Sequence, residues 1–343
     1  MAGDGAEEVL QSLIDTLELC VGKIKEGSLG QVMEDLEMNF SLEEFWMKLG
    51  MTFKAVSKEA TKLTVSFSKP PAPSVEELQC LLTGFETAVI AMLTIYHSLP
   101  LSQGKNLHKK LQETVITVVE DCQALATSFI KEGCSSVASA KTQSTGTLWE
   151  HCDGLQHLPK DNKQAVIAVL ESNSELIKDA LSELDEAQKG NGCQGDNDDD
   201  GDDTEAIKQG WSSEDRLLVP PCVGLVKACR SCVKKISGAI KTSGQATSVE
   251  NIQQLDEMAD GVLRTSPSVD DVVMSLYYPM NRQNVKECTS KLADQLKDLL
   301  TRARNSHFTV DSDSSWLDFL NKAIDHNLNK ITGLLQEQEG SDT

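Results

Sequence analysis

The stretch SVEELQCLLTGFETAVIAMLTIY, residues 74–96, carries the clearest fold signal in this chain. Ser74 stands three residues before Glu77, the spacing of a capping box, in which each side chain bonds the other residue's backbone N–H at a helix start. Apolar residues then recur every three or four positions until Pro100, which places them on one helix face. They are Leu78, Leu81, Leu82, Phe85, Val89, Met92, Leu93 and Tyr96.

The same periodicity recurs along the rest of the chain. Only 22 glycines and 9 prolines interrupt 343 residues, so long helices are favoured. Short turns between long amphipathic helices are typical of antiparallel neighbours in a bundle. We therefore predict an all-α protein built from antiparallel helical bundles. The further stripes cover about 45–67, 107–129, 165–184, 213–240, 248–263, 285–300 and 316–335.

One segment breaks this pattern. Gly190-Asn-Gly-Cys-Gln-Gly195 leads into DNDDDGDDTE, residues 196–205, with seven acids, no base and almost nothing apolar to bury. Such a run repels itself, which predicts a solvated, disordered linker. The sequence therefore predicts an N-terminal bundle over 1–189, an acidic linker over 190–212 and a C-terminal helical region over 213–343.

The charge of the chain argues against direct nucleic-acid binding. Lys and Arg number 32 against 53 Asp and Glu, a formal net charge of −21. Residues 1–195 contribute −12, residues 196–210 contribute −6 and residues 211–343 contribute −3. A protein that tracks phosphates needs a basic face, and a negative field repels the nucleic-acid backbone.

No targeting or membrane segment is predicted. The chain opens with acids, where a signal peptide would carry bases and an apolar core. The most apolar stretch, Ala88–Tyr96, is about half the length that a membrane helix requires. Ten cysteines without an export signal are best interpreted as small core residues. Cys229 and Cys232 have CxxC spacing, but no second pair of zinc ligands follows.

No catalytic or metal-binding motif in the sequence is complete. Asp196, Asp198, Asp200 and Gly201 imitate the start of a calcium loop, but its twelfth position is Ile207 instead of a bidentate Glu. None of the six histidines lies in a zinc-protease or di-iron motif, and no phosphate-binding loop or nucleophile elbow occurs. We expect no enzymatic activity, no cofactor and no metal.

Short docking signals are weak. Arg216-Leu217-Leu218 resembles a minimal cyclin-docking tripeptide, although its leucines also fit the start of a core helix. Two Leu-x-x-Leu-Leu strings begin at Leu78 and Leu296, where burial is the favoured interpretation. Ser266-Pro267 is a candidate for proline-directed phosphorylation at Ser266. The alternative there is a turn that leads into a helix capped by Ser268.

A series of short segments carries a family resemblance. They are SKEATKLTVSFS at 57–68, PKDNK at 159–163, WSSED at 211–215, Val219-Pro220, KKI at 234–236, SPSVDD at 266–271, Pro279-Met280 and AIDH at 323–326. These segments resemble the cyclin-D-binding (GCIP) family, in the same order and with the acidic insertion at the same place. The resemblance spans about residues 40–340.

The resemblance implies an all-helical, non-enzymatic protein of cytoplasm and nucleus. Family partners are D-type cyclins and a haematopoietic SH2/SH3 adaptor, and members are described as restraining retinoblastoma phosphorylation. They are also described as helix-loop-helix proteins without a basic region, which would pair with transcription regulators. In this chain the loop exceeds twenty residues and no basic cluster precedes it. Two bundle helices separated by an insert are therefore the favoured interpretation.

The leading hypothesis is a non-enzymatic interaction protein that binds D-type cyclin and related regulators. Helix faces would anchor partners, and the acidic segment would favour basic ones. The alternatives are a helical scaffold of the vinculin/α-catenin type and, less favoured, a bundle enzyme or metal protein. The predicted interaction residues are Asp198, Asp199, Asp200, Asp202, Asp203, Arg216 and Leu218.

Overall fold

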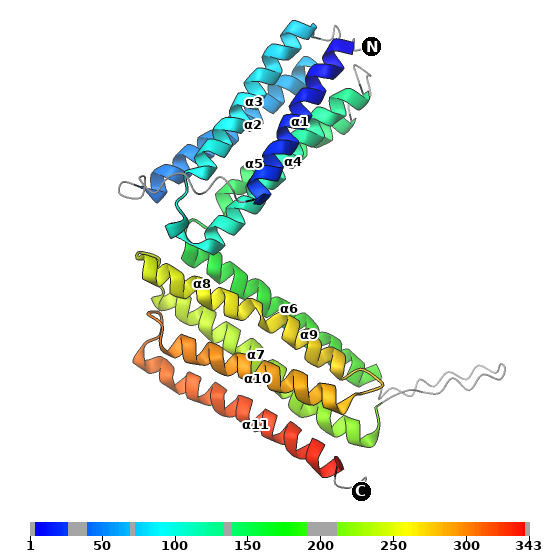
Figure 1. Ribbon diagram of the computed structural model, residues 1–343, viewed down its shortest axis with the longest axis vertical. Coiled ribbons are helices and arrows are strands. Elements are labelled where there is room, and N and C mark those ends of the chain that lie inside the picture. The colour runs from blue at the N-terminus through cyan, green and yellow to red at the C-terminus, as the bar shows by residue number, and fades with distance from the viewer. Residues whose placement is uncertain (1–3, 27–39, 69–72, 133–138, 191–210, 340–343) are drawn as a thin grey trace, which may run out of the picture. The chain divides into compact units, whose positions relative to one another are not determined.

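The computed structural model describes residues 4–26, 40–68, 73–132, 139–190 and 211–339 (Figure 1). Throughout these ranges the regular structure is helical and contains no strand, which confirms the all-α prediction. Residue contacts divide the chain into two compact units, Met1–Asp161 and Asn162–Thr343.

The first unit is a bundle in which α2 packs on α3 and α1 packs on α4 (Figure 1). Helix α5 packs against both α2 and α4. Leucine, valine and phenylalanine side chains at helical spacing fill the core of this first unit. The elements are α1 Asp4–Glu26, α2 Leu42–Ser66, α3 Val75–His97, η2 Leu101–Gln103, α4 Lys105–Glu132, α5 Ser139–Gly154 and η3 Leu155–His157.

Helix α3 starts as its sequence predicts. The Ser74 hydroxyl accepts the Glu77 N–H at 3.2 Å, and the Ser74 N–H donates to Glu77 Oε2 at 2.8 Å. The helix runs from Val75 to His97, and the predicted stripe is buried except for Leu81, which is half-buried. The capping box is therefore real, and the stripe is the core face of α3.

Helix α3 also corrects one sequence prediction. By length and composition it is apolar enough to cross a membrane, whereas the sequence predicted that no segment is. Eight of its side chains, including Leu78, Phe85 and Met92, are buried within the bundle. Core helices of bundles pass the same test, and this burial accounts for the apolar character of α3.

The second unit is a bundle in which α7 packs on both α6 and α11 (Figure 1). Helix α6 also packs on α8, and α10 packs on α9 and α11. One continuous core joins all these helices. The elements are α6 Asn162–Gly190, α7 Ser213–Ser243, α8 Val249–Leu263, α9 Thr265–Ser275, α10 Arg282–Arg304, η4 Asp311–Asp313 and α11 Ser314–Glu339.

The boundary between the units differs from the predicted domain boundary. The sequence analysis assigned α6 to an N-terminal bundle over 1–189, but α6 packs in the second unit. Its buried Val166, Leu170 and Ile177 belong to the core that also holds α7. The predicted boundary followed the change in composition, whereas the compact unit begins at Asn162, where the side chains of α6 join that core.

The buried cysteines behave as core residues. Cys222, Cys229 and Cys232 are fully buried on α7, and no metal-binding group of His, Cys, Asp or Glu occurs in the described ranges. Burial raises the pKa of Cys222 and of Cys229 to about 12, so both thiols are protonated at neutral pH. The leucines that begin the two Leu-x-x-Leu-Leu strings, Leu78 and Leu296, are likewise buried.

Candidate interaction site

The predicted acidic residues Asp198, Asp199, Asp200, Asp202 and Asp203 lie outside the described residues, as does the linker between α6 and Trp211. The structure does describe the point at which the chain continues into α7. The geometry of that point determines what the acidic segment is attached to.

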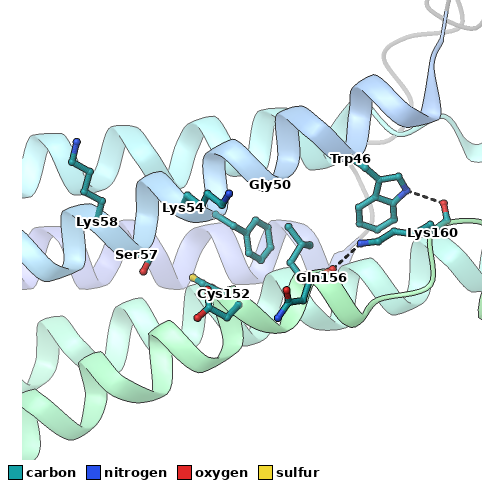
Figure 2. Close-up of a pocket in the computed structure, with 11 residues that line it drawn as sticks. Trp46, Gly50, Lys54, Ser57, Lys58, Cys152, Gln156 and Lys160 are labelled. Atoms are coloured by element: carbon teal, nitrogen blue, oxygen red, sulfur yellow. Dashed lines mark hydrogen bonds between the residues drawn. The ribbon is translucent and has the colours of Figure 1, made fainter.

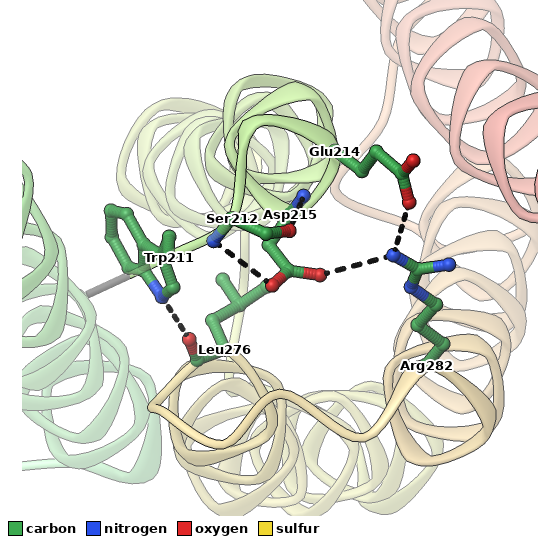
Figure 3. A network of polar contacts seen from close by, with 6 residues as sticks. All are labelled: Trp211, Ser212, Glu214, Asp215, Leu276 and Arg282. Carbon is green, nitrogen blue, oxygen red and sulfur yellow. Dashed lines mark hydrogen bonds and ion pairs between the residues drawn. The ribbon is translucent and has the colours of Figure 1, made fainter. Parts of the chain in front are cut away.

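Trp211 anchors the chain to the second unit. Its indole is 7% exposed and belongs to the unit's core. The Nε1–H donates to the carbonyl oxygen of Leu276 at 2.6 Å, so its polar atom is paired although the ring is buried (Figure 3). The predicted linker extended to residue 212. Packed structure therefore begins two residues earlier than α7 itself.

Helix α7 begins immediately afterwards with a capping box. The Ser212 hydroxyl accepts the Asp215 N–H at 3.0 Å, and the Ser212 N–H donates to Asp215 Oδ2 at 3.2 Å (Figure 3). These bonds satisfy backbone N–H groups that the first helical turn leaves without partners. Glu214 and Asp215 also place negative charge at the positive end of the helix dipole, which is stabilising.

Arg282, from the start of α10, holds both acids. Its Nη2 lies 2.7 Å from Glu214 Oε2 and 3.5 Å from Asp215 Oδ1 (Figure 3). The hydrogen bond to Glu214 is the main reason that the pKa of Arg282 is raised. One guanidinium therefore joins two carboxylates in the first turn of α7 to the start of α10.

Exposed apolar side chains occur in the segment that Trp211 contacts, between the last turn of α9 and the start of α10. Met274 in the last turn of α9 is 70% exposed, and Tyr277 and Tyr278, in the connection to α10, are 45% and 50% exposed. This is the connection whose Leu276 carbonyl receives Trp211 (Figure 3). Tyr and Met are enriched in protein–protein interfaces. We name Glu214, Met274, Tyr277, Tyr278 and Arg282 the α7-start surface.

The predicted cyclin-docking tripeptide is only partly available. Arg216 is exposed and Leu217 is 57% exposed, but Leu218 is fully buried. Leu218 lies on the inward stripe of α7, together with Cys222 and Leu225, and packs in the core. Leu218, predicted as an interaction residue, is thus a core side chain in this structure, and the exposed leucine of the tripeptide is Leu217.

Ser266 lies in the first turn of α9 and is half-buried. The turn predicted to lead into a Ser268 cap does not form, because α9 already begins at Thr265 and Ser268 is buried within it. Thr265 stabilises this start instead. Its hydroxyl donates to the Val262 carbonyl at 2.7 Å and lies 3.1 Å from Asn173 Oδ1. Phosphorylation of Ser266 stays a prediction.

The first unit contains a cleft of about 430 Å³ between α2 and the α5–η3 segment (Figure 2). At one end the Trp46 Nε1–H donates to the Lys160 carbonyl at 2.8 Å. The Lys160 Nζ lies 4.2 Å from the centre of the Trp46 ring, a cation–π contact, and donates to the Leu155 carbonyl at 2.9 Å. Partial burial lowers the pKa of Lys160. These contacts close that end of the cleft.

The side chains lining this cleft are poorly suited to nucleophilic catalysis. Ser57 has no histidine among the eleven lining residues to act as a base. The Cys152 thiol also faces the cleft, but burial, assisted by Asp121 and Asp153, raises its pKa to about 12. A thiol is a good nucleophile only as the thiolate, so Cys152 is unreactive at neutral pH.

A histidine–aspartate pair, His151 and Asp121, is adjacent in sequence to Cys152 and Cys122. His151 Nδ1 is 2.5 Å from Asp121 Oδ2, an arrangement that orients the base in many hydrolases. The adjacent thiols are those of Cys122 and Cys152, and burial raises the pKa of both. Asp121 raises them further instead of promoting ionisation. We interpret the pair as a contact between α4 and α5.

Comparison with known proteins identifies the family. The family model described as Grap2 and cyclin-D-interacting, N-terminal, matches residues 48–190, and its C-terminal counterpart matches residues 196–301. The chain belongs to the cyclin-D-binding protein family. It is 38% identical to the cyclin-D1-binding protein 1 homolog of Xenopus laevis, an alignment covering 96% of this chain and 99% of the relative.

Other relatives of this family member extend the same result. The Danio rerio homolog of cyclin-D1-binding protein 1 is 37% identical, with 95% of each chain covered. Cyclin-D1-binding protein 1 of Homo sapiens is 30% identical over 96% of this chain and 94% of its own length. The first family-model match ends at residue 190 and the second begins at residue 196, close to the predicted domain boundary. The compact units, in contrast, divide after Asp161.

Proposed function

We propose that this family member is a non-enzymatic protein that binds a D-type cyclin and related regulators. Through this binding it restrains cell-cycle progression and retinoblastoma-controlled transcription. The single observation that carries the proposal is family membership along nearly the whole chain, with relatives named for cyclin-D1 binding. From the resemblance set out in the sequence analysis, we further propose a haematopoietic SH2/SH3 adaptor and helix-loop-helix or other transcription regulators as partners, and action in both cytoplasm and nucleus.

The α7-start surface is the proposed contact with the cyclin. It combines three exposed apolar or aromatic side chains with an acid pair held by one arginine. Such anchors supply most of the binding energy in protein interfaces, while surrounding charges set the association rate and exclude wrong partners. Exposed Arg216 and Leu217 extend the surface along the first turns of α7.

The acidic segment adds long-range attraction in this proposal. Its seven acids at 196–205 are attached through Trp211, which the core holds firmly beside the α7-start surface. Negative charges concentrated at one site raise the encounter rate with a basic partner. At 0.1 M salt, screening limits this attraction to distances of about 10 Å. We therefore expect deletion of 196–205 to slow association at low salt while leaving the unfolding temperature nearly unchanged.

The proposal is tested with purified full-length protein and a purified D-type cyclin. The triple variant M274A/Y277A/Y278A removes the apolar anchors, and we expect it to weaken binding by about tenfold or more. The matched control M47A/M51A/F319A removes three equally exposed side chains from α2 and α11 and should bind like wild type. Equal weakening by both triple variants would show that the contact lies elsewhere.

A helical scaffold of the vinculin/α-catenin type is the second candidate. The observation that favours it is the pair of all-helical bundle units built from long helices. It predicts co-sedimentation of the protein with actin filaments at low salt. Absence of the protein from the filament pellet, together with retained cyclin binding, would eliminate this candidate.

A further inference from the structure

Helix α7 carries an unusual distribution of charge. Residues 216–249 contain Arg216, Lys227, Arg230, Lys234, Lys235 and Lys241 but no acid, within a chain of 53 acids. A long acid-free span is not needed to build the core, because the inward stripe of α7 is already apolar. The excess of positive charge therefore lies on the outward face of the helix.

Neighbouring acids on α6 neutralise part of this excess. Lys241 pairs with Glu171, and Arg230 lies 3.5 Å from Glu175. Glu175 also binds Lys178 at 2.7 Å and is near enough to Lys234 that all three cations lower its pKa. One carboxylate is thus shared among several cations. Neither Lys234 nor Lys235 forms an ion pair with any acid that the structure describes.

Both lysines line a groove between α7 and the segment from Val310 to Trp316, which contains η4 and the start of α11. Its volume is about 640 Å³, and its apolar surface comes from Gly238, Ala239, Val310 and Trp316. Val310 is 48% exposed there and Trp316 is half-buried. Lys234, Lys235 and Gly238 share one helix face, because they are three and four residues apart.

The acid in this groove is already engaged. Asp313 Oδ1 accepts the Trp316 Nε1–H at 2.8 Å, and its Oδ2 accepts the Val310 N–H at 3.0 Å. Asp313 therefore fixes the tryptophan and the start of η4. Each of its oxygens thus accepts a hydrogen bond from the Val310–Trp316 segment, and among the described residues Asp313 forms no salt bridge with either lysine. The lysines face the groove as cations with an apolar floor beside them.

We propose that this groove, the α7 basic groove, binds an acidic peptide segment that carries one apolar anchor side chain. The anchor packs on Gly238, Val310 and Trp316, and flanking carboxylates pair with Lys234 and Lys235. Charge complementarity selects the peptide. A nucleic acid or an anionic membrane presents many phosphates over an extended surface, whereas the groove offers two lysines beside a small apolar floor, which fits a short segment with one apolar side chain. The proposal requires no cyclin and stands apart from the α7-start surface.

Gly238 provides a steric test. A Cβ placed on it would meet no heavy atom within 4 Å, so a larger side chain fits without disturbing the fold. The leucine of G238L would occupy the apolar floor and exclude the anchor. The alanine of G238A adds one methyl group and leaves the groove open. Because alanine and leucine are better helix formers than glycine, both variants should melt no lower than wild type.

The binding measurement uses fluorescence anisotropy of the labelled peptide Glu-Asp-Glu-Leu-Glu-Asp-Glu with full-length protein at low salt. We expect saturable binding, weakened about tenfold or more by K234E/K235E and by G238L, and nearly unchanged in G238A. The control K322E/K330E makes the same charge change at two exposed lysines of α11 that do not line the groove. It should alter affinity by less than about twofold.

Four outcomes would overturn the proposal. The first is no saturable binding to wild type. The second is equal weakening by K234E/K235E and K322E/K330E, which would reduce the effect to net charge. The third is binding of phosphatidylserine vesicles or a single-stranded oligonucleotide with the same sensitivity to G238L, because the groove would then recognise phosphate instead of a peptide. The fourth is equal affinity for a peptide with serine in place of leucine, which would show that no apolar anchor contributes to binding.

Discussion

The two ends of α7 share one apolar inward face, but their outward faces carry different charged groups. At its start, Glu214 and Asp215 follow the acidic segment and share a single arginine. In its second half, Lys234 and Lys235 face a groove without an acid partner among the described residues. The inward stripe is continuous between them, from Leu218 to Ile240. Fold and partner selection are therefore separable along this helix, because different faces determine them.

A tryptophan lies near each end of α7: Trp211 directly precedes the helix, and Trp316 of α11 lines the groove beside its second half. The two rings differ in burial. Trp211 is 7% exposed within the core, whereas Trp316 is half-buried and lines the groove. Burial of a large ring stabilises a fold, and partial exposure makes it available to a partner. We therefore expect loss of the Trp211 ring to affect mainly stability, and loss of the Trp316 ring to affect mainly peptide binding in the groove.

The largest expected effect is the loss of the Trp211 anchor. W211A should lower the free energy of unfolding of the second unit by about 3–5 kcal/mol, because it removes a buried ring and leaves the Leu276 carbonyl without its donor. Urea denaturation followed by circular dichroism measures it. W316A, at the other end, should cost clearly less. Equal losses would remove the distinction between an anchoring and a binding tryptophan.

Alkaline pH should destabilise the inward face that both ends share. The pKa of Cys222 and of Cys229 is about 12 in the folded protein, against an unfolded value near 9. Their stabilising contribution is therefore complete below pH 9 and is lost as the pH rises toward 12. The loss is of order 2 kcal/mol per thiol at pH 11. Unfolding midpoints measured from pH 8 to 11 should fall less in C222A/C229A.

A smaller effect is expected at the α7 cap. S212A removes the hydroxyl that accepts the Asp215 N–H and should cost about 1 kcal/mol in denaturant unfolding. S212N retains an N-cap acceptor and should restore most of this loss. If S212N were as unstable as S212A, the capping bond would not be what stabilises the start of α7.

Much of this fold could be predicted from the sequence, because its determinants are local. The Ser74–Glu77 cap and the stripe behind it lie within one helix, so spacing alone reveals them. The Ser268 cap was wrong because tertiary packing buries that serine and starts α9 at Thr265. Composition located the acidic segment, but only packing places α6 with α7.

The candidate sites were less predictable, because they join residues distant in the chain. Trp211 bonds a carbonyl 65 positions away, and Gly238 meets Trp316 only through the packing of α7 on α11. Exposure of Tyr277 and Tyr278 follows from the path of the α9–α10 connection and has no periodic signal. The acid-free span of 216–249 was visible in the sequence and would have indicated the basic face.

The most direct test of cyclin binding at the α7-start surface is titration calorimetry of the full-length protein with a purified D-type cyclin. We predict saturable binding by wild type and by M47A/M51A/F319A, and at least about tenfold weaker binding by M274A/Y277A/Y278A. Absence of any heat of binding with wild type at two well-separated temperatures, at concentrations of about tens of micromolar, would contradict the account. A complex that buries apolar surface changes its binding enthalpy with temperature, so the heat cannot vanish at both.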